Sequence, residues 1–88
     1  MKNYKLELTH RAESELERIA RREPILFKRI MQVLDDLQQD PFQGKRLKGQ
    51  LKDRWSYRVG TYRIIYAIFQ HQLLVIVIDI GHRRDIYR

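Results

Sequence analysis

The last third of the chain has the apolar and polar pattern of consecutive strands. From Trp55 to Val59 every second residue is apolar and the residues between them are polar, which is typical of a strand with one buried face. Gly60–Thr61 follows, and a glycine supplies the positive φ that a type II′ hairpin turn needs at its first position. The pattern therefore predicts a hairpin whose second strand runs from Tyr62 to Phe69.

A third strand is predicted from the nearly continuous apolar run Leu73–Ile80. Such a run is typical of a strand inside a sheet rather than at its edge. Gln70–Gln72 forms the turn before it, Gly81 ends it, and the residues from His82 onward leave the sheet as a short basic tail.

The first half of the chain predicts one strand and two helices. Apolar residues alternate with polar ones from Tyr4 to Leu8, and Thr9 is a suitable cap for a helix after this strand. Apolar residues then recur at helical spacing, and Pro24 sits where a second helix begins before Asp40–Pro41 stops it. We predict residues 1–88 to be a single α+β domain of order β-α-α-β-β-β, with a helical hairpin packed on a small, mostly antiparallel sheet.

The charge and composition of the chain limit the classes of function that it can have. The chain has 18 Lys and Arg against 11 Asp and Glu, a net charge of +7, and no cysteine. This balance indicates an anionic partner. The sequence lacks a signal-peptide pattern and an apolar run long enough to span a membrane, so we expect a cytoplasmic protein with no membrane contact. No P-loop or metal-ligand spacing is present, so we expect neither cofactor nor metal.

The predicted hairpin brings two arginines together. If the turn is Gly60–Thr61, Val59 pairs with Tyr62 and Arg58 lies directly opposite Arg63. Like charges that face each other across strands are destabilising, so a chain selected for stability alone would avoid this pair. We interpret it as a site for an anion. The alternative is that both arginines are solvated surface residues.

Several segments together resemble the RelE/ParE superfamily of toxins. They are the two helices, the basic Lys45–Gly49 loop, the hairpin Tyr57–Tyr66 and the ending Ile80–Tyr87. The resemblance is closest to the RelE branch. It implies a metal-independent endoribonuclease that binds the ribosomal A site and cleaves mRNA by driving the ribose 2′-hydroxyl onto the adjacent phosphate.

The resemblance also implies roles for particular residues. Positions that match the family's catalytic pattern are Arg58, Arg63, Arg83 and Tyr87. Arg63 is expected to clamp the scissile phosphate and Tyr87 to stack on or orient a base. Basic residues expected to bind the RNA backbone are Lys45, Arg46, Lys48, Lys52, Arg54 and Arg84.

The proton-transfer group is not identified. Ser56 stands where some members have a lysine, and a serine is a poor base unaided. His82 is a candidate for proton transfer because its ordinary pKa lies near neutrality.

The resemblance also concerns the partners of the protein, and other functions remain possible. The resemblance implies a cognate RelB-like antitoxin with an acidic amphipathic segment, besides mRNA and the ribosome. A ParE-like inhibitor of DNA gyrase and an inactive, toxin-derived binding module remain open. On composition alone, Arg83 and Arg84 would form an ordinary basic tail, and Tyr87 would cover the sheet edge.

Overall fold

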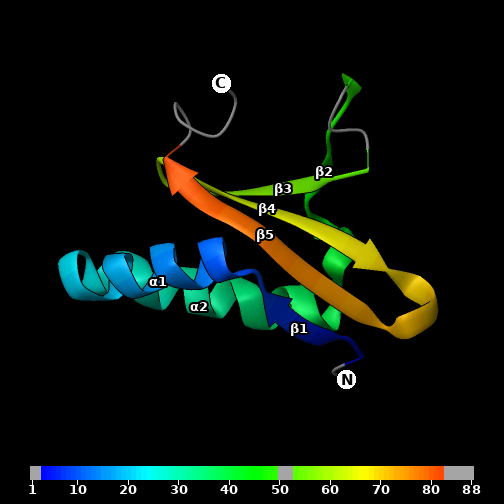
Figure 1. Ribbon diagram of the computed structural model, residues 1–88, viewed down its shortest axis with the longest axis horizontal. Coiled ribbons are helices and arrows are strands. Elements are labelled where there is room, and N and C mark those ends of the chain that lie inside the picture. Colours follow the sequence, from blue (N-terminus) through cyan, green and yellow to red (C-terminus); the bar gives the residue numbers. More distant parts are fainter. Residues whose placement is uncertain (1–2, 50–52, 83–88) are drawn as a thin grey trace.

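The computed structural model describes residues 3–49 and 53–82 (Figure 1). One five-stranded sheet has the order β1-β5-β4-β3-β2, in which β1 runs parallel to β5 and every other neighbouring pair is antiparallel. The predicted α+β order is confirmed, with one addition: a two-residue strand, β2, lies in the segment predicted to be a loop. The elements are β1 (Lys5–Leu8), α1 (His10–Arg22), α2 (Pro24–Gln39), η1 (Pro41–Gln43), β2 (Lys45–Arg46), β3 (Trp55–Val59), β4 (Tyr62–Phe69), η3 (Gln70–Gln72) and β5 (Leu74–His82).

The two helices form an antiparallel pair that covers one face of the sheet (Figure 1). Buried side chains of α1 and α2, among them Ile19, Ile30 and Leu37, form a common core with Ile64 and Tyr66 of β4. Neither helix covers the opposite face of β3, β4 and β5 (Figure 1). No helix in the described parts of the chain is long and apolar enough to cross a membrane.

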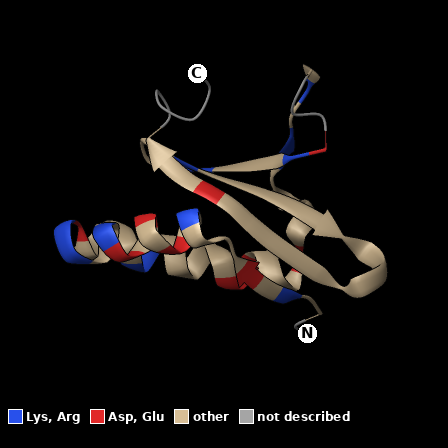
Figure 2. Ribbon diagram, viewed as in Figure 1, with Lys and Arg blue, Asp and Glu red and all other residues tan. Residues whose placement is uncertain are grey.

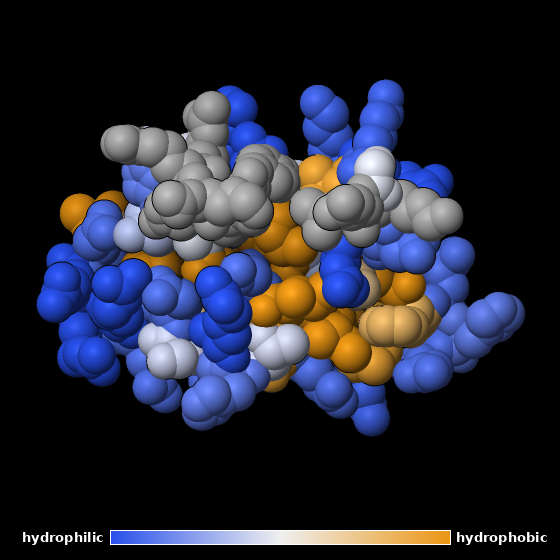
Figure 3. Space-filling view, turned by 45° about the horizontal axis from the view of Figure 1, so that its top comes forward, coloured by the Kyte–Doolittle hydropathy of each residue, from blue (hydrophilic) through white to orange (hydrophobic). Residues whose placement is uncertain are grey.

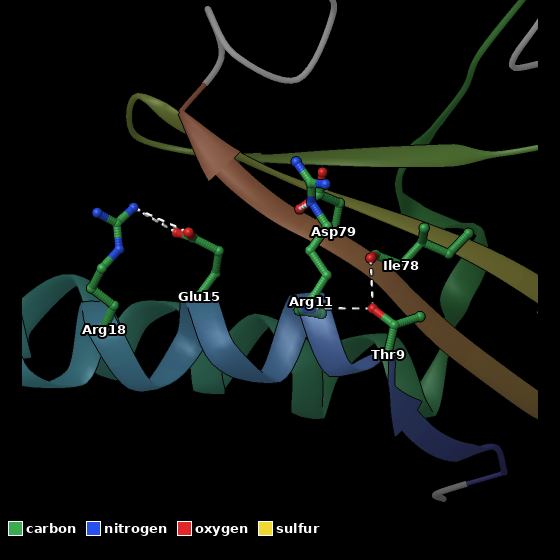
Figure 4. Close-up of polar contacts among 7 residues, drawn as sticks. Thr9, Arg11, Glu15, Arg18, Ile78 and Asp79 are labelled. Carbon is green, nitrogen blue, oxygen red and sulfur yellow. Dashed lines mark hydrogen bonds and ion pairs between the residues drawn. The ribbon is translucent and has the colours of Figure 1, made fainter.

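Thr9 joins the start of α1 to the middle of β5. Its hydroxyl accepts a hydrogen bond from the Ala12 amide at 3.1 Å and donates to the Ile78 carbonyl at 2.7 Å (Figure 4). The predicted cap is therefore present, and it also fixes the helix against the sheet. Beside it, Arg11 Nε lies 3.1 Å from a carboxylate oxygen of Asp79.

Three details differ from the sequence-based expectation. The strand β5 does not end at Gly81 but continues to His82, because β4 offers Arg63 and Tyr62 as partners for these two residues. Leu73 precedes β5 instead of starting it, with φ of 50° at the end of the turn. Met31, one of the apolar residues in the sequence of α2, is 43% exposed instead of buried.

Tyr66 holds the segment before β3 against the sheet. Its ring is fully buried, and its hydroxyl donates to the Pro41 carbonyl at 2.7 Å and accepts from the Gly44 amide at 3.2 Å. Burial raises the pKa of Tyr66 to about 12. A Cβ at Gly44 would collide with the Tyr66 hydroxyl and lie 2.6 Å from the Ser56 carbonyl oxygen. Only glycine therefore lets the chain pass this close to β3.

Candidate functional site

The β3–β4 hairpin has the predicted register. Val59 pairs with Tyr62, and Arg58 lies directly opposite Arg63. Gly60 has φ of 61°, and among the described non-glycine residues a positive φ occurs at Leu73 and not at Thr61, as in a type II′ turn. Both predictions are confirmed, and the turn therefore fixes the two arginines on adjacent strands.

The two arginines lie on the face of the sheet that the helices leave uncovered. Val59 and Tyr62 contribute to the core beneath the sheet, and side chains alternate between faces along a strand. Arg58 and Arg63 therefore point to the other face. The next residue in the same row is Gly81 of β5, which has no side chain.

Ser56 and Lys45 complete this cluster, here called the basic face. Ser56 is 3% exposed, and Arg63 Nη1 donates a long hydrogen bond of 3.5 Å to its hydroxyl. Lys45 of β2 lies directly opposite Ser56. Three cationic side chains, Lys45, Arg58 and Arg63, thus share one face around a serine hydroxyl. Their positive charges suit a phosphate, and the planar fork of arginine can hold two of its oxygens.

The other residues predicted to bind RNA, where the structure describes them, lie around β2 and the start of β3. Arg46 and Lys48 are exposed and Arg54 is partly exposed, and Arg46 pairs with Trp55 at the other end of β3 from Arg58. Figure 2 shows lysine and arginine along this edge of the sheet. Four residues predicted to act or bind lie outside the described residues, namely Lys52, Arg83, Arg84 and Tyr87.

His82 is not brought together with the basic face. It pairs with Tyr62, and the two rings pack edge to face with centroids 5.8 Å apart. The Tyr62 hydroxyl donates to the Glu23 carboxylate, between the two helices, at 3.3 Å. Burial, and then the nearby Glu23 charge, raises the pKa of Tyr62. His82 therefore packs on the helix side of the sheet, away from Arg63.

The described residues hold no group of three histidine, aspartate or glutamate side chains placed to bind a metal ion. What the basic face can do follows from its own groups. It can attract a phosphodiester, hold it by charge-assisted hydrogen bonds, and stabilise negative charge that develops on phosphate oxygens. Lys45 was expected to serve only general phosphate attraction, and nothing in the sequence placed it beside Ser56.

Known proteins with the same architecture identify the family. The family model described as the ParE toxin of the type II toxin–antitoxin system parDE matches residues 6–87. Toxin RelG of Mycobacterium tuberculosis is 34% identical over 86 residues, which cover 97% of each chain. The crystal structure of the RelBE2 toxin–antitoxin complex from the same organism matches with a TM-score of 0.80 and 29% identity, covering 97% of both chains.

The isolated RelE toxin of Escherichia coli shares the fold at 21% identity, with a TM-score of 0.75, and the match covers 90% of this chain and 83% of that one. Sequence and fold thus lead to the same group of proteins. The chain therefore belongs to the RelE/ParE superfamily, as a toxin of RelE/YoeB type from a type II toxin–antitoxin system.

Proposed function

We propose that the protein is a ribosome-dependent endoribonuclease that cleaves mRNA in the A site without a metal ion. The observation that supports it most is the pair Arg58 and Arg63, held directly opposite each other on the uncovered face of the sheet. A fold under selection for stability alone would not keep two like charges in this register. A bound phosphodiester would remove their repulsion.

In this mechanism the RNA supplies its own nucleophile. The 2′-hydroxyl attacks the adjacent phosphorus, the bond to the 5′-oxygen of the next nucleotide breaks, and a 2′,3′-cyclic phosphate and a free 5′-hydroxyl result. Arg63 binds the non-bridging oxygens, where negative charge grows in the transition state, and Arg58 adds a second positive charge. The family resemblance implies that Arg83 neutralises the leaving 5′-oxygen or positions a proton donor, and that Tyr87 stacks on or orients a base.

Lys45 is the group that we propose for proton transfer in place of the missing family lysine. The family position is occupied by Ser56, and the amine of Lys45 projects from the residue directly across the β2–β3 pair from it. An amine can accept a proton when it is deprotonated, which an arginine cannot do at ordinary pH. His82 packs on the other face of the sheet and has no part in this step.

Primer extension on a defined mRNA tests the function. Ribosomes programmed with an empty A site are mixed with the purified protein in the presence of a chelator. Cuts confined to the A-site codon, and absent without ribosomes, are expected. Arg63→Ala should lower the cleavage rate by about 100-fold or more, the scale of losing one transition-state charge contact.

Matched variants separate the site from general charge. Arg22→Ala removes one arginine from the exposed end of α1 and should leave cleavage nearly unchanged. Lys45→Ala should change the pH dependence of the rate, whereas Lys48→Ala should not. Unimpaired cleavage by Arg63→Ala, or absence of cuts by folded protein with ribosomes, would contradict the proposal.

An antitoxin is the expected protein partner. The structure of the similar RelBE2 protein is that of a toxin–antitoxin complex. Figure 3 shows apolar surface in the middle of one face, bordered by hydrophilic side chains, and the chain carries a net charge of +7. An acidic amphipathic segment of a RelB-like antitoxin that folds on binding would complement both properties.

Inhibition of DNA gyrase is the second candidate, because the matching family model bears the name of ParE. A supercoiling assay with purified gyrase distinguishes the two functions. Arrest of supercoiling at stoichiometric protein, together with absence of A-site cuts, would favour this candidate over RNA cleavage.

A further inference from the structure

A pocket of about 530 Å³ lies at the end of β3 that is remote from Arg58. It forms because β3 begins at Trp55, opposite Tyr66, whereas β4 continues to Phe69. The side chain of Phe69 and the residues before β3 thus surround a space next to the start of β3, where β4 has no partner on this side. Its volume falls in the range of small-molecule binding sites.

Three aromatic residues line this pocket: Phe42, Trp55 and Phe69. The rings of Phe42 and Trp55 pack edge to face with centroids 5.5 Å apart, and Trp55 stacks on Tyr66 at 6.4 Å. Packing against buried Tyr66 holds the indole in place. Phe42 and Phe69 are nevertheless 44% and 41% exposed, so two large aromatic side chains face solvent at a concave site.

The rim of the pocket is basic. Arg46, which pairs with Trp55 across β2 and β3, and Arg54, which precedes Trp55, both line it, against the single acid Asp53. Aromatic walls bordered by arginines suit a planar base that carries a phosphate, because the base stacks on the rings while the guanidinium groups bind phosphate oxygens. An apolar peptide segment would use the aromatic walls but would leave the arginines without an anionic partner.

We propose that this pocket binds one nucleotide of single-stranded RNA, with the base against Trp55 and Phe69 and the phosphate on Arg46 and Arg54. This inference rests on the proposed function insofar as RNA is the ligand. Trp55 is three residues from Arg58 on β3, so their Cα atoms lie about 10 Å apart. The Trp55 side chain packs on the helix side of the sheet, opposite to Arg58 and Arg63. An RNA strand held at Arg63 therefore reaches the pocket by passing along Arg54 and around the end of β3, which would give the toxin a nucleotide preference outside the cleaved bond.

Tryptophan fluorescence tests the pocket directly, because Trp55 is the single tryptophan of the chain. Short single-stranded RNA oligomers with a non-cleavable 2′-O-methyl backbone are titrated into the full-length protein without ribosomes. Stacking of a base should quench the emission of Trp55. An oligomer of the same length whose sugar-phosphate backbone carries no bases should bind more weakly and should not quench.

A pair of variants provides the control. Phe69→Ala removes an exposed wall of the pocket and should weaken binding of the intact oligomer by about tenfold. Met31→Ala removes a side chain of similar exposure, 43%, from α2 outside the pocket and should bind as the parent does.

Failure of this inference is distinguishable from failure of the proposed function. Quenching that depends on bases and on Phe69, in a protein that makes no A-site cuts, supports the pocket and overturns the nuclease. Absent quenching, or quenching that is equal with the base-free oligomer or insensitive to Phe69→Ala, overturns the pocket even if the mRNA is cut. Quenching by an antitoxin peptide but not by RNA would show that the pocket binds a protein partner, and this result would also overturn the inference.

Discussion

Replacing Arg58 with glutamine should stabilise the protein while removing activity. In the observed register Arg58 lies directly opposite Arg63, where Cβ atoms are about 5 Å apart. If the charged ends splay to roughly 8 Å in water, two unit charges repel each other by about 0.5 kcal/mol. Arg58→Gln should release this energy and raise the melting temperature by about 2–4 °C for a domain of this size.

Salt dependence and a control variant distinguish repulsion between the two arginines from a general effect of net charge. The gain should appear in thermal unfolding by circular dichroism at about 10 mM salt and nearly vanish at about 1 M, where charges are screened within about 3 Å. Lys28→Gln removes one positive charge from an exposed position of α2 and reports the effect of net charge alone. It should give less than half of the gain.

Two results would refute the reasoning. In the first, Arg58→Gln stabilises the protein no more than Lys28→Gln does; in the second, its gain in stability persists at high salt. Either result would mean that the two arginines do not store repulsion in the free protein. The placement of the two arginines would then not indicate an anion site.

Two further predictions concern the support behind the basic face. Tyr66→Phe removes a buried hydroxyl and leaves the Pro41 carbonyl and the Gly44 amide without it, so urea unfolding should show a loss of about 1–3 kcal/mol. In the parent, Tyr66 ionises near pH 10 when unfolded and near pH 12 when folded. The free energy of unfolding should therefore have its full value below pH 10 and fall by about 2–3 kcal/mol as the pH rises to 12. Tyr66→Phe lacks this contribution, so an equal fall in both proteins would contradict the prediction. Gly44→Ala places a Cβ 2.6 Å from the Ser56 carbonyl oxygen and should cost about 1–3 kcal/mol in the same assay; parent-like stability would show that β2 can move away from β3.

The hairpin could be predicted from the sequence because its determinants are local. The alternation from Trp55 to Val59 sets which side chains point to the core, and the glycine sets the register that pairs Arg58 with Arg63. Each of these features depends on residues that are close together in the chain.

Other features of the site depend on distant contacts. The strand β2 has two residues, too few for a period, so nothing in the sequence indicated that Lys45 lies opposite Ser56. The face of the sheet on which His82 lies depends on an irregularity in the β4–β5 pairing, where Ile65 pairs with Asp79 but Tyr66 pairs with Val77. The unpaired residue between them reverses the alternation along β5. It thereby turns His82 towards the helix side of the sheet.

The parallel pairing of β1 with β5 governs the order in which the chain can fold during synthesis. Lys5 pairs with Leu74 and Leu8 with Val77, so the first strand has no partner until β5 has left the ribosome. The helical hairpin is made earlier, and its core residues Ile19, Ile30 and Leu37 then have no sheet to cover them. Because these long-range pairings must close together, a nascent toxin acquires its basic face only when nearly all of the described chain has been translated.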